Sequence, residues 1–559
     1  MNLSQEKLKE ILVGSGFISE NDFAAAVKTS ADFGRDIADV LIFRGLINED
    51  SLSKLISEHL NVPYINVARV VIPENVLGLI PEKIARNFWM VPFKVENRQL
   101  FVAMDNPHDF EALELARRQT GLQIVPYYSS HESLRRALAQ YKKNIREDFD
   151  RVIQENVKKA SADADPIKSA EKLPIIKVLD TILSYAVAER ASDVHIETMA
   201  DEVVIRFRID GILEDILRLN RGIENALIAR IKIISNLKID EHRVPQDGRY
   251  KFSMDDGKIS LRISIIPGFY AENVVMRLLL ETDRPSSLEE LGISGVNLKA
   301  LQTNIKRPHG MLLVTGPTGS GKTTSLYSVL NILNTVEVKI CTIEDPIEYG
   351  VNRVSQIQVN PKTGLTFAMG LRALLRHDPD IIMVGEIRDP ETAKIAVNAA
   401  MTGHLVLSTL HTNQAAGAIP RLLDMGVEGY LLASTLNLVV AQRLVRKICP
   451  SCLTEYQPNQ EAIKKLSNDL STNLQNQKFY KGKGCAECNH TGYQGRVGIY
   501  EAIEVTEEIR NLIANRSTSS QLQAEAIKQG MTTLLQDGLN KVASGLTTIE
   551  EVIRVVRQD

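Results

Sequence analysis

A glycine-rich turn between an apolar strand and a helix constrains this chain more than any other feature. It lies within MLLVTGPTGSGKTTSLYSVLNI, residues 311–332, and has the spacing G-x-x-x-x-G-K-T of a phosphate-binding loop. The loop residues are Gly316, Pro317, Thr318, Gly319, Ser320, Gly321, Lys322, Thr323 and Thr324. Glycines let backbone N–H groups surround phosphates, and the N-terminus of the following helix favours an anion. We therefore predict an ATP site with Lys322 on the phosphates and Thr323 on Mg²⁺, rather than a structural glycine-rich turn.

Carboxylates follow the next two predicted strands. The segment KICTIEDPIEY begins as an apolar strand and ends in Glu344, Asp345 and Glu348, and the strand IIMVG runs into Glu386. Carboxylates at strand ends beside Mg·ATP can bind the metal or orient the attacking water. We expect both groups near the phosphate loop; a surface acidic turn is the alternative for the first group.

Two histidines flank a further apolar strand within TGHLVLSTLHT. Lone histidines are more often satisfied core residues, but His404 and His411 lie at the ends of a strand of the same predicted parallel sheet. We predict that His411 senses the γ-phosphate, and we treat His404 as a second candidate.

Length and composition indicate a soluble protein of several domains. The chain has 559 residues, and a typical domain size of about 150 residues predicts about three to five units. The net charge of -3 argues against a surface that coats nucleic acid. No secretory signal is visible, so we expect a cytoplasmic protein. The uncharged stretch 395–420 is long enough to span a bilayer, but its polar side chains indicate buried core and active site instead.

The N-terminal third predicts two modules. Residues 1–69 contain a weak repeat in which each copy has two helices around a glycine-containing turn, with caps at Ser19 and Asn48. Residues 70–141 alternate strands and helices, as in a compact α+β module. We interpret the first module as a helical adaptor; a regulatory ligand site and a docking surface for a membrane partner are the alternatives.

A charged helix and a linker, residues 146–173, precede a mixed unit at residues 174–295. This unit opens with the helix IIKVLDTILSYAVAERA and continues with strands rich in arginine. Its arginines are Arg206, Arg208, Arg243, Arg249, Arg262 and Arg277. Alternating arginine usually marks a solvated sheet face; alternatively, one or two of these side chains reach an ATP phosphate on a neighbouring domain.

Four of the five cysteines form two C-x-x-C pairs. The pairs are Cys449 with Cys452 and Cys485 with Cys488, which suits a tetrahedral zinc site built from four thiolates. Four protein ligands leave no open position, so we predict structural Zn²⁺; an apo site and redox pairs are the alternatives. We expect the intervening EAIKKLSNDLSTNLQNQ to be a polar helix and loop.

Four motifs occur in order along the chain: GPTGSGKTT, IEDPIEY, DPDIIMVGEIRD and TGHLVLSTLHT. In this order and at these separations, they resemble the four boxes of the type II secretion and type IV pilus assembly ATPases. Further motifs, from ASDVHIE to GYQGRVGIYE, extend the resemblance over roughly residues 170–559.

The resemblance implies a multidomain α/β protein. A RecA-like P-loop ATPase domain, residues 296–442, would follow a PAS-like α+β domain at 174–295 and an N-terminal MshEN-like or type II secretion E N-terminal domain at 1–145. A zinc-binding insertion at 443–497 and a helical subdomain at 498–559 would complete the chain.

The resemblance also implies roles for site residues. Lys322 would hold the β- and γ-phosphates, Thr323 the Mg²⁺, and Glu348 would polarise the attacking water. Glu386 would be the acidic residue of the second metal-side strand, and which glutamate is the general base stays open.

The family's arginines in the preceding domain map onto Arg208 and Arg243, with Arg249 and Arg277 as further candidates. Family members are hexameric rings whose two-part subunits pump as ATP closes the cleft between the parts.

The implied function is a hexameric ATPase that drives assembly of a type IV pilus or a type II secretion pseudopilus. It would be peripheral to the cytoplasmic face of the inner membrane, with a polytopic platform protein and a cytoplasmic adaptor as partners. A non-hydrolysing scaffold or switch, a retraction or DNA-uptake motor, and a nucleic-acid translocase are the alternatives. The near-neutral charge and the lack of an aromatic-basic groove pattern weaken the translocase alternative.

The N-terminal repeat resembles a domain that binds cyclic di-GMP through R-L-G-x-x-L motifs. The corresponding stretches here begin Lys7-Leu8-Lys9 and Asp36-Ile37-Ala38, and both lack the glycine. We therefore predict a preserved fold with weak or absent dinucleotide binding.

Overall fold

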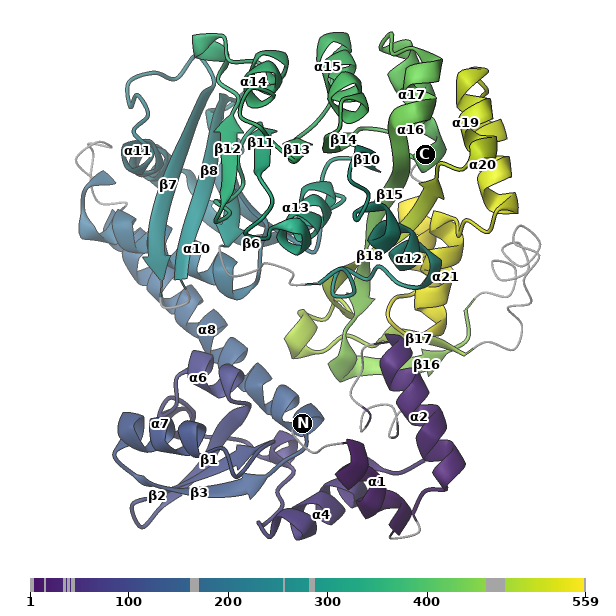
Figure 1. Ribbon diagram of the computed structural model, residues 1–559. Helices are drawn as coiled ribbons and strands as arrows, with labels where there is room; N and C mark the ends of the chain where they lie inside the picture. The colour runs from purple at the N-terminus through teal and green to yellow at the C-terminus, as the bar shows by residue number, and fades with distance from the viewer. Residues whose placement is uncertain are drawn as a thin grey trace.

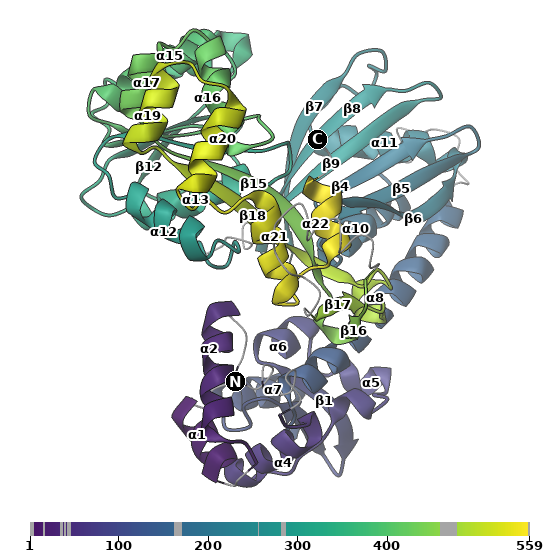
Figure 2. The ribbon, with the colours of Figure 1, turned by 90° about the vertical axis from the view of Figure 1, so that its right-hand side faces the viewer.

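The computed structural model describes residues 5–14, 17–33, 37, 41, 46–160, 170–254, 257–280, 287–458 and 478–556. Figure 1 shows an N-terminal region below two larger bodies, and Figure 2 shows the same arrangement from the side. The long helix α8 (His131–Ala160) runs from the N-terminal region to the body that contains the six-stranded sheet. The other body contains a seven-stranded sheet.

The N-terminal region begins with short helices that pack on one another. They are α1 (Gln5–Gly14), α2 (Glu20–Phe33) and α4 (Glu49–Leu60). The predicted caps are confirmed, because Asn48 accepts from the Ser51 N–H and Ser19 accepts from the Asp22 N–H. Asp36 and Ala38, in the second of the stretches compared with R-L-G-x-x-L, lie outside the described residues.

A three-stranded sheet follows, as the sequence predicts for residues 70–141. Its elements are α5 (Glu74–Leu77), α6 (Glu82–Asn87), β1 (Met90–Glu96), β2 (Gln99–Met104), α7 (Phe110–Thr120) and β3 (Gln123–Tyr128). The predicted boundary at residue 145 falls inside α8, which contains no glycine or proline that would end it. Phe149 of α8 stacks on Tyr185 in the next unit, with ring centroids 4.4 Å apart. Most of the predicted linker, residues 161–169, lies outside the described residues.

The unit at 174–295 is an antiparallel sheet with helices on one face. The sheet order is β6-β5-β4-β9-β8-β7. The strands are β4 (Asp193–Thr198), β5 (Glu202–Ile209), β6 (Ile212–Asn220), β7 (Gln246–Met254), β8 (Gly257–Pro267) and β9 (Glu272–Leu280). The helices α10 (Leu173–Ala188) and α11 (Glu224–Ile234) share its apolar core. The α+β prediction is confirmed, while its PAS-like character stays a prediction.

The largest body is built on a mostly parallel sheet, ordered β12-β11-β13-β14-β10-β15-β18. Its strands are β10 (Gly310–Thr315), β11 (Ile340–Glu344), β12 (Val354–Gln358), β13 (Ile381–Val384), β14 (Leu405–Leu410), β15 (Leu436–Ile448) and β18 (Tyr493–Glu504). All six residues of β10 are buried, because sheet and helices cover both of its faces. Only β18, at the edge, runs antiparallel to its neighbour.

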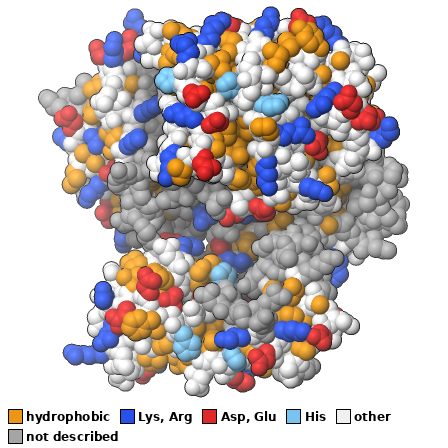
Figure 3. All heavy atoms as spheres, viewed as in Figure 1, with side chains coloured by type: hydrophobic (Ala, Val, Ile, Leu, Met, Phe, Trp, Pro, Cys, Tyr) orange, Lys and Arg blue, Asp and Glu red, His pale blue; other side chains and the backbone are white. Residues whose placement is uncertain are grey.

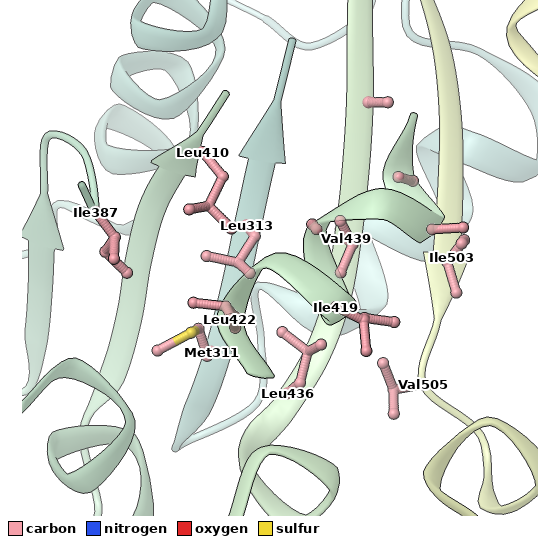
Figure 4. Packing of buried hydrophobic residues seen from close by; sticks show 14 of the residues in the cluster. Met311, Leu313, Ile387, Leu410, Ile419, Leu422, Leu436, Val439, Ile503 and Val505 are labelled. Carbon is pink, nitrogen blue, oxygen red and sulfur yellow. The ribbon is translucent and has the colours of Figure 1, made fainter. Parts of the chain in front are cut away.

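Helices cover both faces of this sheet. They are α12 (Gly295–Asn304), α13 (Lys322–Leu333), α14 (Phe367–Leu374), α15 (Pro390–Met401), α16 (Ala415–Asp424) and α17 (Gly429–Thr435). One core contains Leu313 of β10 and Leu422 of α16, and the opposite core contains Leu312 of β10 and Leu326 of α13. Figure 4 shows the first of these cores. The uncharged stretch 395–420 is divided between α15, β14 and α16.

The domain boundaries predicted around the cysteine region differ from the structure because of two long strands, β15 and β18. The boundaries at 442 and 497 fall inside these strands, which pair over most of their length and carry the cysteines beyond their ends. The cysteine region is therefore an extension of the main sheet, with β16 (Leu453–Tyr456) and β17 (Phe479–Gly482) paired beside it. The expected helix and loop between the cysteine pairs falls largely on residues 459–477, outside the described residues.

The C-terminal tail is helical after residue 506, as predicted, although residues 498–504 belong to β18. The helices are α19 (Glu507–Ala514), α20 (Ser519–Lys528), α21 (Leu534–Ala543) and α22 (Ile549–Val556). The buried Glu501 carboxylate of β18 accepts from the N–H groups of Ala415 and Leu534, which begin α16 and α21. One carboxylate thus fixes the first residues of α16 and α21 to the sheet.

Candidate functional site

The phosphate loop and the predicted acidic residues meet at the edge of the main sheet that is formed by the carboxyl ends of its parallel strands. Strands β10, β11, β13 and β14 are parallel and in register, so the residues that follow them emerge together. His411 follows β14 at this edge, whereas His404 precedes that strand at the opposite edge. The His404 Nδ1 lies 2.9 Å from the Ala399 carbonyl oxygen, so His404 has a local structural contact and lies away from the loop.

The loop backbone requires glycine because it lies directly against β15. Gly316, Gly319 and Gly321 have φ of 152°, 78° and 85°. A Cβ on Gly316 would lie 2.5 Å from the Gln442 carbonyl oxygen, and one on Gly321 would lie 2.8 Å from Gln442 Nε2. A side chain at Gly316 would therefore push the loop away from β15, whereas one at Gly321 would displace the end of the Gln442 side chain and one at Gly319 would meet open space.

Lys322 lies over this loop with its ammonium group turned inward. Its Nζ donates to the carbonyl oxygens of Gly316 and Pro317, at 2.8 and 2.9 Å. Burial lowers the pKa of Lys322 to about 8. Ser320 Oγ is buried and has no hydrogen-bond partner among the described residues. A phosphate oxygen would suit both groups, so the loop fits the nucleotide predicted from sequence.

Glu344 has a structural environment. Its buried carboxylate accepts hydrogen bonds from Tyr327 of α13, from Thr342 and from Gln356. Burial raises its pKa, which the three donors oppose. Glu344 therefore joins β11 to the helix that follows the phosphate loop.

Glu348 faces the preceding body. Arg262 of β8 donates from Nη2 to Glu348 Oε2 at 3.3 Å, and Arg249 of β7 donates to Gln358 Oε1 at 3.1 Å. Two arginines of the six-stranded sheet thus contact the main sheet, one at the loop that carries Glu348 and one at the end of β12.

Arg208 and Arg243 are not brought to the phosphate loop of their own chain. Arg208 Nε lies 3.6 Å from Asp193 Oδ2, and Arg277 Nε donates to Asp193 Oδ1 at 2.9 Å. Arg243 is exposed. Their roles stay predictions. Sequence reasoning did not single out Arg262, because alternation along β8 gives its sheet face but not the body opposite that face.

Glu386 and His411 are brought together at the sheet edge. His411 Nε2 lies 3.3 Å from Glu386 Oε2, and Arg388 Nη2 lies 2.6 Å from Glu386 Oε1. The Glu386 charge acts on Lys322 by raising its pKa against the effect of burial. Glu386 and His411 therefore form one polar cluster with Arg388, and the Glu386 charge acts on the loop lysine.

Two residues of β15 complete the site and were missed in the sequence. Gln442 accepts from Ser325 Oγ at 2.8 Å through Oε1, and Arg443 donates from Nη2 to the Asn413 carbonyl at 2.8 Å. No motif marks them, since they lie in AQRLVRK, far along the chain from the loop.

The four cysteines form a second site at the far ends of β15 and β18. The Sγ atoms of Cys449 and Cys485 lie 3.9 Å apart, as do those of Cys452 and Cys488, and those of Cys485 and Cys488 lie 3.7 Å apart. Zn–S bonds of about 2.3 Å in a tetrahedron give edges of about 3.8 Å, which agrees with these distances. The backbone N–H groups of Gly484 and Gly492 also donate to cysteine sulfurs.

The cysteine region contacts the body that contains the six-stranded sheet. Asn489 Nδ2 donates to Glu189 Oε2 at 2.9 Å, and the Gly495 N–H donates to Asp210 Oδ2 at 2.6 Å. The short turns that hold the cysteines, 450–452 and 486–488, also pack against α8. The cluster therefore lies where three parts of the chain meet.

Among the described residues, no helix combines the length and apolarity needed to cross a bilayer.

The model of the MshEN domain matches residues 60–148, which confirms an MshEN domain in the N-terminal region. The stretches compared with R-L-G-x-x-L, at residues 7–12 and 36–41, precede this match. The comparisons with known proteins do not support the prediction of weak cyclic di-GMP binding.

Comparisons with known proteins over most of the chain agree with the site. The Type IV pilus assembly ATPase PilB of Myxococcus xanthus is 39% identical over 555 residues, which covers 98% of each chain. The Type II secretion system protein E of Dickeya dadantii is 44% identical over 457 residues, which covers 80% of this chain and 91% of the relative. The X-ray structure of the Legionella pneumophila ATPase DotB shares the fold, with a TM-score of 0.50 at 23% identity over 67% of this chain and 94% of DotB.

The family model described as Type II/IV secretion system protein matches residues 168–554, from the six-stranded sheet to the last helix. This range contains the phosphate loop, both glutamates, His411 and the four cysteines. The chain belongs to the Type II/IV secretion system protein family and is an ATP-hydrolysing enzyme of the pilus and secretion assembly ATPases.

Proposed function

We propose that this chain is a homohexameric motor that drives type IV pilus assembly from the cytoplasmic face of the inner membrane. The observation that carries this proposal is the similarity to PilB along nearly the whole length of both chains, including the N-terminal region. A type II secretion role is the second candidate, supported by the higher identity to the protein E relative over a shorter range.

The family resemblance supplies the partners of this proposal: a polytopic inner-membrane platform protein and a cytoplasmic adaptor. Nucleic acid is not among them. Figure 3 shows basic and acidic side chains interspersed on one face of the molecule, so that face has no field of a single sign to attract a polyanion.

The catalytic proposal assigns each group at the sheet edge a task. Lys322 exchanges its two loop carbonyls for phosphate oxygens of ATP, and Glu348 takes the proton of the attacking water. Glu386 and His411, already in contact, lie beside the terminal phosphate. Mg²⁺ held by the exposed Thr323 would neutralise phosphate charge.

The arginine contacts support the coupling of hydrolysis to motion. Arg262 neutralises Glu348 in this structure, so a water that engages Glu348 competes with a contact between the two bodies. Arg249 supplies a second contact on the neighbouring strand. We propose that ATP binding and hydrolysis rearrange these contacts and move one body against the other.

Substitution of the proposed base tests the catalytic assignment. The variant Glu348→Gln should bind ATP normally but lose roughly a hundredfold or more in turnover, because an amide cannot accept the proton. Steady-state phosphate release and nucleotide titration measure the two effects. The exposed Glu337→Gln is the matched control and should behave as the unmodified chain. Normal turnover in Glu348→Gln with loss in Glu386→Gln would give the base role to Glu386.

Metal analysis tests the proposed structural zinc. The purified full-length chain should contain about one zinc ion, and Cys485→Ser should lose it, because four thiolates are needed to close the tetrahedron. Removal of the metal by a chelator should also lower the melting temperature, since metal binding contributes to folding. Cys341→Ser, which changes the fifth cysteine far along the chain, should retain zinc. A metal-free chain with an unchanged melting temperature would contradict the site.

Recovery of the chain from membranes tests which machine it serves. A tagged full-length chain, crosslinked in cells and purified from membranes, should bring with it the platform protein of a type IV pilus, identified by mass spectrometry. Deletion of the gene for this chain should abolish surface pili. Recovery of secretion components with normal piliation would favour the second candidate, and a monomeric mass in the presence of ATP would contradict the ring.

A further inference from the structure

Strand β15 passes directly beside the phosphate loop. Its Ala441 pairs with Thr315, the last residue of β10, so Gln442 and Arg443 continue beyond the end of β10 at the level of the loop. Arg443 is only 5% exposed. A buried guanidinium thus lies within the body that binds the nucleotide.

The Arg443 side chain crosses the end of β10. Its Nη2 donates to the Asn413 carbonyl at 2.8 Å, and Asn413 belongs to the loop that follows β14. Because β10 lies between β14 and β15 in the sheet, this hydrogen bond joins the two strands on either side of it. The joined loop begins with His411, two residues before Asn413.

Two further contacts hold the same loop. Thr315 Oγ1 accepts from the Thr412 N–H at 2.9 Å, and Glu501 Oε1 accepts from the Ala415 N–H at 2.8 Å. The loop is therefore fixed from β10, β15 and β18, and the Arg443 guanidinium provides the hydrogen bond from β15.

The Arg443 charge also acts on the phosphate site. Arginine stays protonated at all physiological pH values. Burial lowers the pKa of Lys322, the Glu386 charge raises it, and the Arg443 charge lowers it. Because the strand register places Arg443 at the level of the phosphate loop, its charge opposes that of the loop lysine and would attract a bound anion.

We propose that Arg443 is a positioning residue for ATP hydrolysis: it fixes the His411 loop to β15 and holds a permanent positive charge beside the phosphate loop. The inference rests on the proposed roles of Lys322 and His411. It accounts for a buried arginine on a strand whose neighbouring positions are mostly apolar.

Three variants of the full-length chain separate the two parts of the role. Arg443→Gln removes the charge and the guanidinium, Arg443→Lys keeps the charge but changes the geometry, and Arg446→Gln is the matched control. Arg446 lies on the same strand and is also largely buried, but its guanidinium binds Glu551 of α22. Steady-state ATPase activity is measured for each across the pH range 6 to 10, with the melting temperature measured alongside.

The shift of the pH profile that we expect has a definite direction. The unmodified chain should lose kcat/KM as pH rises through about 8, where free Lys322 loses its proton. Without the repulsion from Arg443, Lys322 keeps its proton to a higher pH, so Arg443→Gln should move this loss of kcat/KM to higher pH. Its kcat should fall about tenfold or more, because the His411 loop is misplaced. Arg443→Lys should lower kcat with the pH profile unmoved.

The control variant should have a lower melting temperature with unchanged kcat and pH profile. An Arg443→Gln chain with unchanged kcat and an unmoved pH profile would overturn the inference. If this variant fails to fold, normal kcat in Arg443→Lys would overturn the inference instead. Lys322→Ala provides the reference for the nucleotide site. If Lys322→Ala retains full activity, the proposed phosphate site fails instead, which distinguishes the two failures.

Discussion

The close approach of the phosphate loop to β15 is the contact on which the catalytic site depends. Gly316 leaves no room for a Cβ against the Gln442 carbonyl, and Gly321 lies against the end of the Gln442 side chain, so the loop lies directly on a strand that enters the sheet far along the chain. The sheet order places β10 between β14 and β15, and the groups that follow β11, β13 and β14 emerge beside the loop. Under the proposed function, Glu348, Glu386 and His411 would therefore reach one nucleotide although distant in sequence, because parallel strands bring their carboxyl ends to one edge.

Among the described residues, hydrogen bonds join the two larger bodies at two separate places. At the nucleotide edge, Arg262 and Arg249 of the six-stranded sheet bind Glu348 and Gln358. At the far ends of β15 and β18, the cysteine region binds Glu189 and Asp210. The first place contains a carboxylate that hydrolysis would use, whereas the second contains only structural groups. This difference suits a motor in which one contact changes with the nucleotide while the other limits the movement.

Local pattern was enough to predict much of this structure. The phosphate loop, the strands that end in carboxylates, the cysteine pairs and the caps Ser19 and Asn48 all follow from spacing and residue type. Pairing between distant segments was not predictable. The boundary placed at residue 442 divides β15, because the sequence does not show that β15 and β18 extend the main sheet. Likewise, six arginines on strands look alike in sequence, and only the packing of two bodies distinguishes Arg262, on Glu348, from Arg208, on Asp193.

If two bodies of the chain share one catalytic site, the turnover number of the Arg262→Gln variant should fall. Arg206→Gln is the matched control, since Arg206 lies in the same sheet but binds Glu197 and Asp215 of its own body. The account predicts that kcat of Arg262→Gln falls about tenfold or more, with an unchanged melting temperature, while Arg206→Gln keeps its kcat. Full turnover in Arg262→Gln would contradict the account, because the contact between Arg262 and Glu348 would then have no part in hydrolysis.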